Sequence, residues 1–389
     1  MKQNKFINFE KDVGIFIRGK APPFDFSFLA LTGILALFGS IMVFSAGAAY
    51  AEFRYGDEYF FIKRQIVWLL LGFAVMLIAS RIKPEVYFKI TPILYSVTIC
   101  LLILVLAIGF VGNGAQRWIS IGPITIQPSE IAKMTIVMML AYYFSRNEKL
   151  ALDKRNAKNK FLYGTLIPCL IMGFPIILVM LQKHLSCIII LGVIGLLVIV
   201  ASGIDTKYIS MFSLVGVMGV ASLALFTDYT KDRIMVWRDP ESYKLTGGWQ
   251  TLQGLMAIGS GGLFGLGFGK SLLKFCYVSE PANDMIFAIL CEELGFVGAV
   301  ITIIIFSLLV IRGYTISLRA RNVYERLVIF GVCTKIAVQV LLNIAVVTNT
   351  IPNTGISLPF FSYGGSSLIM LFFEIGMLLS FSRYARITK

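Results

Sequence analysis

The stretch that decides the fold runs from Gly247 to Gly295 and reads GGWQTLQGLMAIGSGGLFGLGFGKSLLKFCYVSEPANDMIFAILCEELG. It is the longest run of an otherwise apolar chain that is too polar, too rich in glycine and too charged to cross a membrane. Asp284 lies near its far end, where the apolar pattern resumes as MIFAIL. The rest of the sequence therefore resembles a membrane scaffold built around this polar segment.

The composition is that of a polytopic membrane protein. Of 389 residues, 57% are hydrophobic and only 14% are charged, and the mean hydropathy is +0.82. The six cysteines include no CxxC pair, which argues against a disulfide framework and against a zinc site. The net charge of +14 comes from basic residues dispersed at the ends of apolar segments, so we expect no nucleic-acid partner.

Apolar windows of about 20 residues, enough to cross roughly 30 Å of hydrocarbon, predict about ten transmembrane helices. Helices are expected because backbone groups in lipid must pair within their own segment. The fold class is thus an all-α polytopic membrane protein, with one transmembrane domain over 27–383 flanked by segments 1–26 and 384–389. The predicted spans are 27–47, 65–81, 88–111, 129–145, 162–181, 185–203, 207–227, 284–311, 327–348 and 366–382.

The distribution of lysine and arginine places both termini in the cytoplasm. About 22 of the 35 basic residues fall in the N-terminal segment, the C-terminal tail and the connections on the same side. The extracytoplasmic side then holds segments 112–128, 228–283 and 349–365. The long loop 228–283 separates the seventh and eighth spans, and connections of that length are usually functional. Its spaced apolar residues favour re-entrant or interfacial helices that line a groove.

The glycines of this loop do not form a phosphate-binding motif. Counting back from Gly269-Lys270-Ser271, Phe264 stands where the Walker A motif requires its first glycine. Gly265, Gly267 and Gly269 give GxGxG, which also differs from the dinucleotide-binding GxGxxG. Tight turns and close approach of helices are the simpler interpretation.

Asp284 is the leading candidate for chemistry. It opens an apolar run, at a depth where partial burial should raise the pKa of its carboxyl group. A carboxylate so placed can act as a general base at the boundary between water and lipid. Aspartate also caps helices well, so Asp284 as only the N-cap of the eighth span is the alternative.

A second group of ionisable residues falls inside predicted spans, where such residues usually pair or line a cavity. Glu130 and Lys133 stand at i and i+3, which predicts an internal ion pair. A proton or ion pathway that includes Glu292 and Glu293 is an alternative, although only one of these two can share a helix face with Asp284. His184, at the turn before the sixth span, is expected to cap or to donate a hydrogen bond. The group consists of Glu130, Lys133, Glu292, Glu293, Lys335 and Glu374.

Four segments carry a family resemblance. They are SAGAAYA with YFFIKRQIVW (45–68), RWISIGPITIQPSEIAK (117–133), the stretch 247–298, and NTGISLPFFSYGGSS (353–367). Together, and in this order, they resemble the SEDS family (shape, elongation, division and sporulation) of peptidoglycan glycosyltransferases, which includes FtsW, RodA and SpoVE. The glycine-rich loop and the start of the chain favour the FtsW and SpoVE side, whereas TGISLPF is shared with RodA-like members.

The resemblance implies an enzyme of the bacterial cytoplasmic membrane that polymerises lipid II into glycan strands at the outer face, for cell division or related wall synthesis. Asp284 occupies the family's acidic position before Ile-Phe-Ala, where the catalytic carboxylate is expected. An inverting transfer from an undecaprenyl-diphosphate-linked glycan needs one general base and no covalent nucleophile. A class B penicillin-binding protein with transpeptidase activity, and other divisome or elongasome membrane proteins, are the implied partners.

The leaving diphosphate gathers negative charge, so the resemblance also implies cations beside it. Arg117, Arg233 and Lys274 occupy basic positions in matching motifs. Gln250, in GWQ where GYQ is usual, is expected to hold the loop or a sugar. No carboxylate cluster predicts a protein-held metal, although Mg²⁺ or Mn²⁺ could share the charge of the diphosphate. The candidates for diphosphate or sugar binding are Arg117, Arg233, Lys274, Gln250, Arg238 and Lys270.

The chain departs from the family pattern at three places. Ala282-Asn283-Asp284 replaces His-Thr-Asp, Val278-Ser279-Glu280 replaces Leu-Pro-Glu, and Gln182-Lys183-His184 replaces Gln-Pro-Asp. Two other functions stay open. One is a lipid II flippase whose cavity would use Glu130, Lys133, Glu292 and Lys335, and the other is a scaffold that recruits a transpeptidase.

Overall fold

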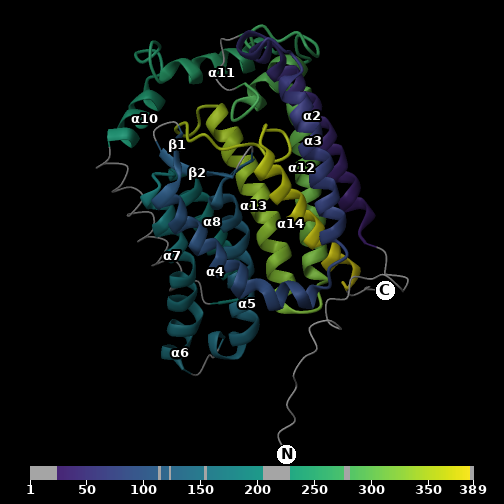
Figure 1. Cartoon of the computed structure of the whole chain (residues 1–389), viewed down its shortest axis with the longest axis vertical. Coiled ribbons are helices and arrows are strands. Elements are labelled where there is room, and N and C mark those ends of the chain that lie inside the picture. The colour runs from purple at the N-terminus through teal and green to yellow at the C-terminus, as the bar shows by residue number, and fades with distance from the viewer. Residues whose placement is uncertain are drawn as a thin grey trace, which may run out of the picture.

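The computed structural model describes residues 24–112, 115–121, 124–152, 156–204, 228–275 and 281–385. Long helices run side by side, and α10 and α11 lie across one end, here called the upper end (Figure 1). The helices are α2 (Phe26–Tyr55), α3 (Phe60–Ala79), α4 (Pro84–Ile108), α5 (Pro128–Ala151), α6 (Ala157–Phe161), the π-helical turn η1 (Leu162–Leu166), α7 (Ile167–Leu181), α8 (Leu185–Ala201), α10 (Asp228–Arg238), α11 (Gly248–Ser260), α12 (Ile286–Leu318), α13 (Val323–Val347) and α14 (Gly365–Arg383).

The membrane-spanning class predicted from hydropathy is confirmed. Within the described residues, 7 helices are long and apolar enough to cross a bilayer, and α8 is a shorter apolar helix. The fourth predicted span coincides with α5, which is long enough but more polar. The seventh, 207–227, lies outside the described residues, so the count of ten stays a prediction. The qualifying helices are α2, α3, α4, the continuous segment Lys158–Leu181, α12, α13 and α14.

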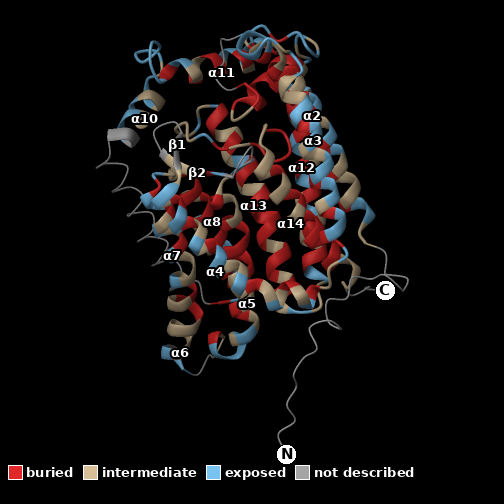
Figure 2. Cartoon of the chain, viewed as in Figure 1, coloured by how far each residue is buried: buried red, intermediate tan, exposed pale blue. Residues whose placement is uncertain are grey.

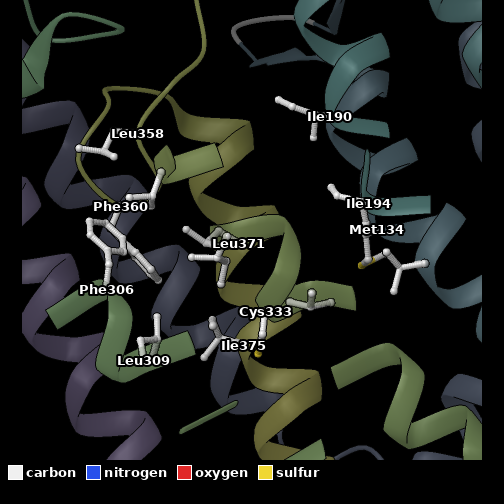
Figure 3. Packing of buried hydrophobic residues seen from close by; sticks show 14 of the residues in the cluster. Met134, Ile190, Ile194, Phe306, Leu309, Cys333, Leu358, Phe360, Leu371 and Ile375 are labelled. Atoms are coloured by element: carbon white, nitrogen blue, oxygen red, sulfur yellow. The ribbon is translucent and has the colours of Figure 1, made fainter. Parts of the chain in front are cut away.

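The helices divide into central and peripheral ones. Buried residues cover 67% of the apolar window of α13 but only 17% of that of α3. Figure 2 shows the same division, with buried positions gathered on α13 and α14 and exposed ones on α2 and α3. In the core, Phe306 and Leu309 of α12 lie near Phe360 and near Leu371 and Ile375 of α14 (Figure 3). Apolar side chains that point outward from the peripheral helices suit a lipid environment.

The sequence predicts one continuous span over 284–311, but the structure shows a helix that is broken within this range. Gly295 has φ 66° and ψ −168°, a backbone conformation that essentially only glycine adopts, and it breaks α12. The part above the break is almost wholly buried. The break frees backbone N–H and C=O groups that an intact helix would pair.

The residues 261–275, here called the glycine loop, pair these freed groups. Phe296 and Val297 donate their N–H groups to the carbonyls of Gly262 and Leu263, at 2.9 and 3.1 Å. In return, the carbonyls of residues 292–293 accept from the N–H groups of residues 266–267, at 2.9 and 3.0 Å. Non-helical backbone near membrane depth is tolerated where protein satisfies it in this way.

Close approach explains why the loop is rich in glycine. A Cβ atom on Gly261 or Gly265 would lie 2.0 or 2.1 Å from a carbonyl oxygen of α12, and one on Gly295 would lie 2.4 Å from the backbone of the loop. Gly265 also has φ +78°. The interpretation of these glycines as packing and turn residues is therefore confirmed.

A small sheet was not expected from the sequence. Strands β1 (Phe110–Gly112), β2 (Ala115–Ile121) and β3 (Ile124–Ile126) are antiparallel, in the order β1-β2-β3. They occupy most of the predicted connection 112–128, on the side of the bundle near the turn between α7 and α8 (Figure 1). The sheet carries Arg117 toward that turn.

Candidate active site

Asp284 lies on the turn 281–285, here called the Asp284 turn, which immediately precedes α12. The N-cap of α12 is Met285, whose side chain makes no capping hydrogen bond. Asp284 is therefore not the N-cap residue of this helix. Asp284 is partly buried, so its carboxylate stands between the protein interior and solvent.

Three consecutive carbonyl oxygens fix the backbone of this turn. The carbonyls of residues 282–284 accept, in order, from the backbone N–H of Tyr363 at 2.8 Å, the hydroxyl of Ser362 at 2.7 Å and the side-chain amide of Asn343 at 2.9 Å. These bonds use only the backbone of the turn. Alanine and asparagine at the two positions before Asp284 are therefore compatible with the same local geometry.

The donors are themselves anchored. The amide of Asn343, a fully buried residue of α13, also donates to the carbonyl of Ile356 at 2.7 Å. Ser362 accepts from the N–H of Leu358 at 2.7 Å. Sequence reasoning gave neither residue a role in the site. The only signals were one amide within the apolar run LLNIAVV and a serine within the matching segment 353–367.

The carboxylate is in a network with residues from three other segments. The amide of Gln250, on α11, donates to Oδ1 of Asp284 at 3.4 Å and accepts from the amide of Asn353 at 3.2 Å. The guanidinium of Arg233, on α10, donates to the backbone carbonyl of Asn353. Gly355 faces Oδ2, since a Cβ atom there would stand 3.7 Å from it. The structure thus brings together three predicted site residues through Asn353, which sequence reasoning missed.

The other predicted cations lie apart from this network. Arg117 donates to the carbonyl of Lys183 at 2.6 Å, beside the α7–α8 turn. Arg238 and Lys270 are exposed, at the end of α10 and in the glycine loop. Lys274 is buried, and its ammonium donates to the carbonyl of Gly269 at 2.7 Å.

Lys274 belongs to a buried cluster that anchors the glycine loop. Its ammonium pairs with Glu293 at 3.1 Å, and Glu293 also accepts from the hydroxyl of Ser45 on α2. Glu292 accepts from the N–H groups of residues 272–273 at 2.9 and 3.3 Å and from the hydroxyl of Ser271. These bonds commit both glutamates to holding the loop rather than to a pathway that continues from Asp284.

Deeper in the bundle, the predicted pair of Glu130 and Lys133 is confirmed, with 2.7 Å between oxygen and nitrogen. Lys335 of α13 pairs with Glu374 of α14. A polar cavity of about 30 Å³, lined in part by Glu130, Lys335 and Gln339, lies against the segment 357–362. A cavity of this size holds one or two water molecules and is far too small for a disaccharide.

His184 contacts a hydroxyl group through its ring and does not cap a helix with it. It occupies the N-cap position of α8 without a capping bond from its ring, and Nδ1 lies 3.5 Å from the hydroxyl of Ser129. Burial, together with the nearby charges of Arg117 and Lys133, lowers the pKa of His184 to about 3, so the ring is neutral at physiological pH. Among the described residues, no group of three or more His, Cys, Asp or Glu side chains could hold a metal ion.

Known proteins resemble the chain over nearly its whole length. Residues 26–387 match the family model FTSW_RODA_SPOVE, described as "Cell cycle protein". The chain is 37% identical to Stage V sporulation protein E of Bacillus subtilis (strain 168), covering 93% of this chain and 98% of that protein. It is 33% identical to the probable peptidoglycan glycosyltransferase FtsW of Geobacter sulfurreducens, with 92% and 95% covered. It is 34% identical to the peptidoglycan glycosyltransferase MrdB of Escherichia coli (strain K12), with 92% of each covered.

Two solved structures are also similar to this chain over nearly its whole length. The rod shape determining protein RodA of Thermus thermophilus superposes with a TM-score of 0.68 at 26% identity, covering 93% of this chain and 97% of that one. A chain from a structure described as "Structural coordination of polymerization and crosslinking by a peptidoglycan synthase complex" superposes with a TM-score of 0.76 at 26% identity, covering 93% and 98%.

Proposed function

The chain belongs to the SEDS family of FtsW, RodA and SpoVE, and on that premise we propose that it is a peptidoglycan glycosyltransferase that polymerises lipid II. The observation that carries the proposal is the arrangement around Asp284. One partly buried carboxylate stands on a turn whose three backbone carbonyls accept hydrogen bonds, with Gln250 on one carboxylate oxygen and Arg233 bound to the neighbouring loop.

Asp284 acts as the general base. Its carboxylate takes the proton of the 4-hydroxyl group of the acceptor N-acetylglucosamine while that oxygen attacks the anomeric carbon of the donor strand. The bond from the anomeric carbon to the diphosphate breaks, and the departing oxygen keeps the electron pair. Attack from the opposite face converts the α-linked donor into a β-glycosidic product, so no covalent enzyme intermediate is needed.

Gln250 and Arg233 prepare this step, and both contact Asn353. The amide of Gln250 orients the carboxylate so that the oxygen facing Gly355 meets the acceptor hydroxyl. Arg233 supplies positive charge where the diphosphate leaves, and fixed cations lower the barrier most where charge develops in the transition state. Arg117, Arg238 and Lys270 are further candidates for the diphosphate, whereas the ion pair of Lys274 with Glu293 gives that lysine a positioning role.

A divalent cation would be held mainly by the substrate. Mg²⁺ favours a few carboxylates together with phosphate oxygens, and the described residues offer no cluster of acidic side chains beside Asp284. Such an ion, bound to the diphosphate, would neutralise part of its charge. The residues of the chain supply the base and the fixed cations.

The active site is extracytoplasmic and both termini are cytoplasmic in this proposal, because the lysine and arginine distribution favours that orientation. The bacterial cytoplasmic membrane is then the location. The structural relative described as a complex for polymerization and crosslinking supports a transpeptidase, a class B penicillin-binding protein, as partner. Relatives named for sporulation and as FtsW and MrdB support wall synthesis without separating division from elongation.

The test is polymerisation of lipid II by the purified protein in proteoliposomes, with and without the transpeptidase. Wild type should form glycan strands, and Asp284→Ala should form none. Asp239→Ala is the matched control, because Asp239 is an exposed aspartate between α10 and α11 that bonds only to its own turn. Full polymerisation by Asp284→Ala would contradict the proposal. Transbilayer movement of lipid II by a wild type that forms no polymer would favour the flippase.

A further inference from the structure

A chain of aromatic rings leads from the Asp284 turn to the upper tip of the α2–α3 hairpin. It begins at Tyr363, whose N–H group holds the first of the three carbonyls of that turn. The Tyr363 ring packs against Phe61 with centroids 4.9 Å apart, and Phe61 lies 6.1 Å from Tyr55. Tyr55 stacks on Phe60 at 3.8 Å, with the two ring planes 6° apart. The rings thus form a continuous connection between the Asp284 turn and the tip.

The far end of this chain is open. Phe53 is 80% exposed, Tyr55 49% and Tyr59 47%. The ring of Phe53 contacts no other ring in the described part of the chain. Exposed apolar surface gathered in one place on a folded protein usually marks a site of interaction.

The tip extends beyond the upper end of α14. The lower end of α2 is fixed by Asp25, which pairs with Arg312 at 2.6 Å and bonds Ser382 near the lower end of α14. From that common level α2 has 30 residues and α14 has 19, so at 1.5 Å per residue α2 rises about 16 Å beyond α14. Its full length of about 45 Å also exceeds the roughly 30 Å hydrocarbon core. In Figure 1 the upper end of α2 reaches the height of α11.

The charge of the tip argues against an anionic lipid headgroup as its ligand. Lys63 pairs with Asp57 at 2.8 Å, and the guanidinium of Arg64 lies 4.1 Å from the centre of the Phe60 ring. A surface that binds anionic lipid carries an excess of cations, whereas here acidic and basic side chains balance. They are Glu52, Asp57 and Glu58 on one side and Arg54, Lys63 and Arg64 on the other.

We propose that Phe53, Tyr55 and Tyr59, here called the aromatic tip, bind carbohydrate, namely the glycan strand that the Asp284 site extends. This inference rests on the proposed function. One face of a sugar ring consists of C–H bonds, which pack on an aromatic face because the electron-rich ring attracts their partly positive hydrogens. The tip keeps the growing strand beside the carboxylate between successive additions and thereby lengthens it.

The length of the strands tests this role. In the lipid II assay, the Phe53→Ala/Tyr55→Ala variant should make strands roughly three to ten times shorter, the range expected for the loss of one or two aromatic contacts. The initial rate of lipid II consumption should stay within about twofold of wild type, because neither residue contacts the carboxylate. Phe53→Trp/Tyr55→Trp should restore the length. Tyr243→Ala, which removes an exposed aromatic ring from the turn before α11, should leave it unchanged.

The remaining outcomes separate the inference from the function it rests on. Strands of wild-type length from the alanine variant would overturn the proposal. If that variant made strands of wild-type length but inserted less efficiently into proteoliposomes, the tip would be assigned to the membrane interface instead. If wild type itself formed no polymer, the proposed function would fail. The tip would then be tested by titrating the tryptophan fluorescence of Phe53→Trp with an N-acetylglucosamine tetramer. A saturable change supports carbohydrate binding, and no change contradicts it.

Discussion

The Asp284 turn and the glycine loop are two neighbouring parts of the upper end, and they treat their charged residues in opposite ways. The turn is held by hydrogen bonds to its backbone, so the carboxylate of Asp284 is partly exposed. The loop is held through its charged side chains, so Lys274 and Glu293 are buried against each other. The ammonium of Lys274 is committed to Glu293 and to the carbonyl of Gly269, which leaves it little capacity for a substrate. The comparison therefore distinguishes the candidate catalytic carboxylate from the charges that hold the loop.

The largest effect is expected where the glycine loop meets the break in α12. Gly295→Ala should prevent correct folding, because alanine at this backbone conformation costs about 1–3 kcal/mol and contact with the glycine loop costs about 1–3 kcal/mol more. The yield of monodisperse protein and its melting temperature measure this. Gly259→Ala is the control, since that helical position has open space around it. If Gly295→Ala had the yield and melting temperature of wild type, the break in α12 would not depend on glycine.

Lys274→Met should destabilise the protein by roughly 3–5 kcal/mol, because it leaves Glu293 buried without its cation. Adding Glu293→Gln should recover much of that loss of stability, because the double variant buries no unpaired charge. Melting temperatures of the single and double variants give the coupling between the two sites. If Lys274→Met instead kept its stability and lost only activity, Lys274 would belong with the substrate-binding cations.

Asn343→Ala should lower activity more than stability, which would sharpen the distinction between the Asp284 turn and the glycine loop. The change removes the donor to the carbonyls of Asp284 and Ile356, and a shift of about 1 Å in a reacting group can cost about a hundredfold in rate. Lipid II turnover and melting temperature are measured together. Thr348→Ala, at the exposed end of the same helix, is the control. Equal activity of the two variants would mean that the bond to the turn does not position the carboxylate.

The smallest of these effects is expected at Arg233. Arg233→Ala should reduce turnover about tenfold to a hundredfold through lost stabilisation of the leaving diphosphate, with little change in melting temperature. Lys160→Ala, near the opposite end of the bundle, serves as the control. Equal turnover by the two variants would argue against Arg233 as a phosphate-binding residue.

Much of the fold could be predicted because hydropathy reports directly on membrane spans. The pair of Glu130 and Lys133 could also be predicted, since the two residues are one helical turn apart. The break at Gly295 and the small sheet could not, because both depend on partners outside their own segment. No local pattern distinguishes a glycine that packs a helix from one that breaks it.

The site was predicted in part, and for a similar reason. Matching motifs identified Asp284, Gln250 and Arg233 without showing what holds them. Asn343 lies 59 positions from Asp284 in the sequence, and its bond to that turn becomes visible only in the fold. The motif also gave Lys274 and Arg233 the same expected role, although burial beside Glu293 commits Lys274 to the loop. Residue type and position thus predict candidates, and the hydrogen-bond partners separate them.

The rate of lipid II polymerisation by Asp284→Asn, compared with wild type at equal melting temperature, tests the central claim most directly. This change keeps the size of the side chain and removes the base. We expect the rate to fall by about a hundredfold to ten-thousandfold, the usual contribution of a general base. A rate within a few fold of wild type would show that another group removes the proton, and the account built on Asp284 would be wrong.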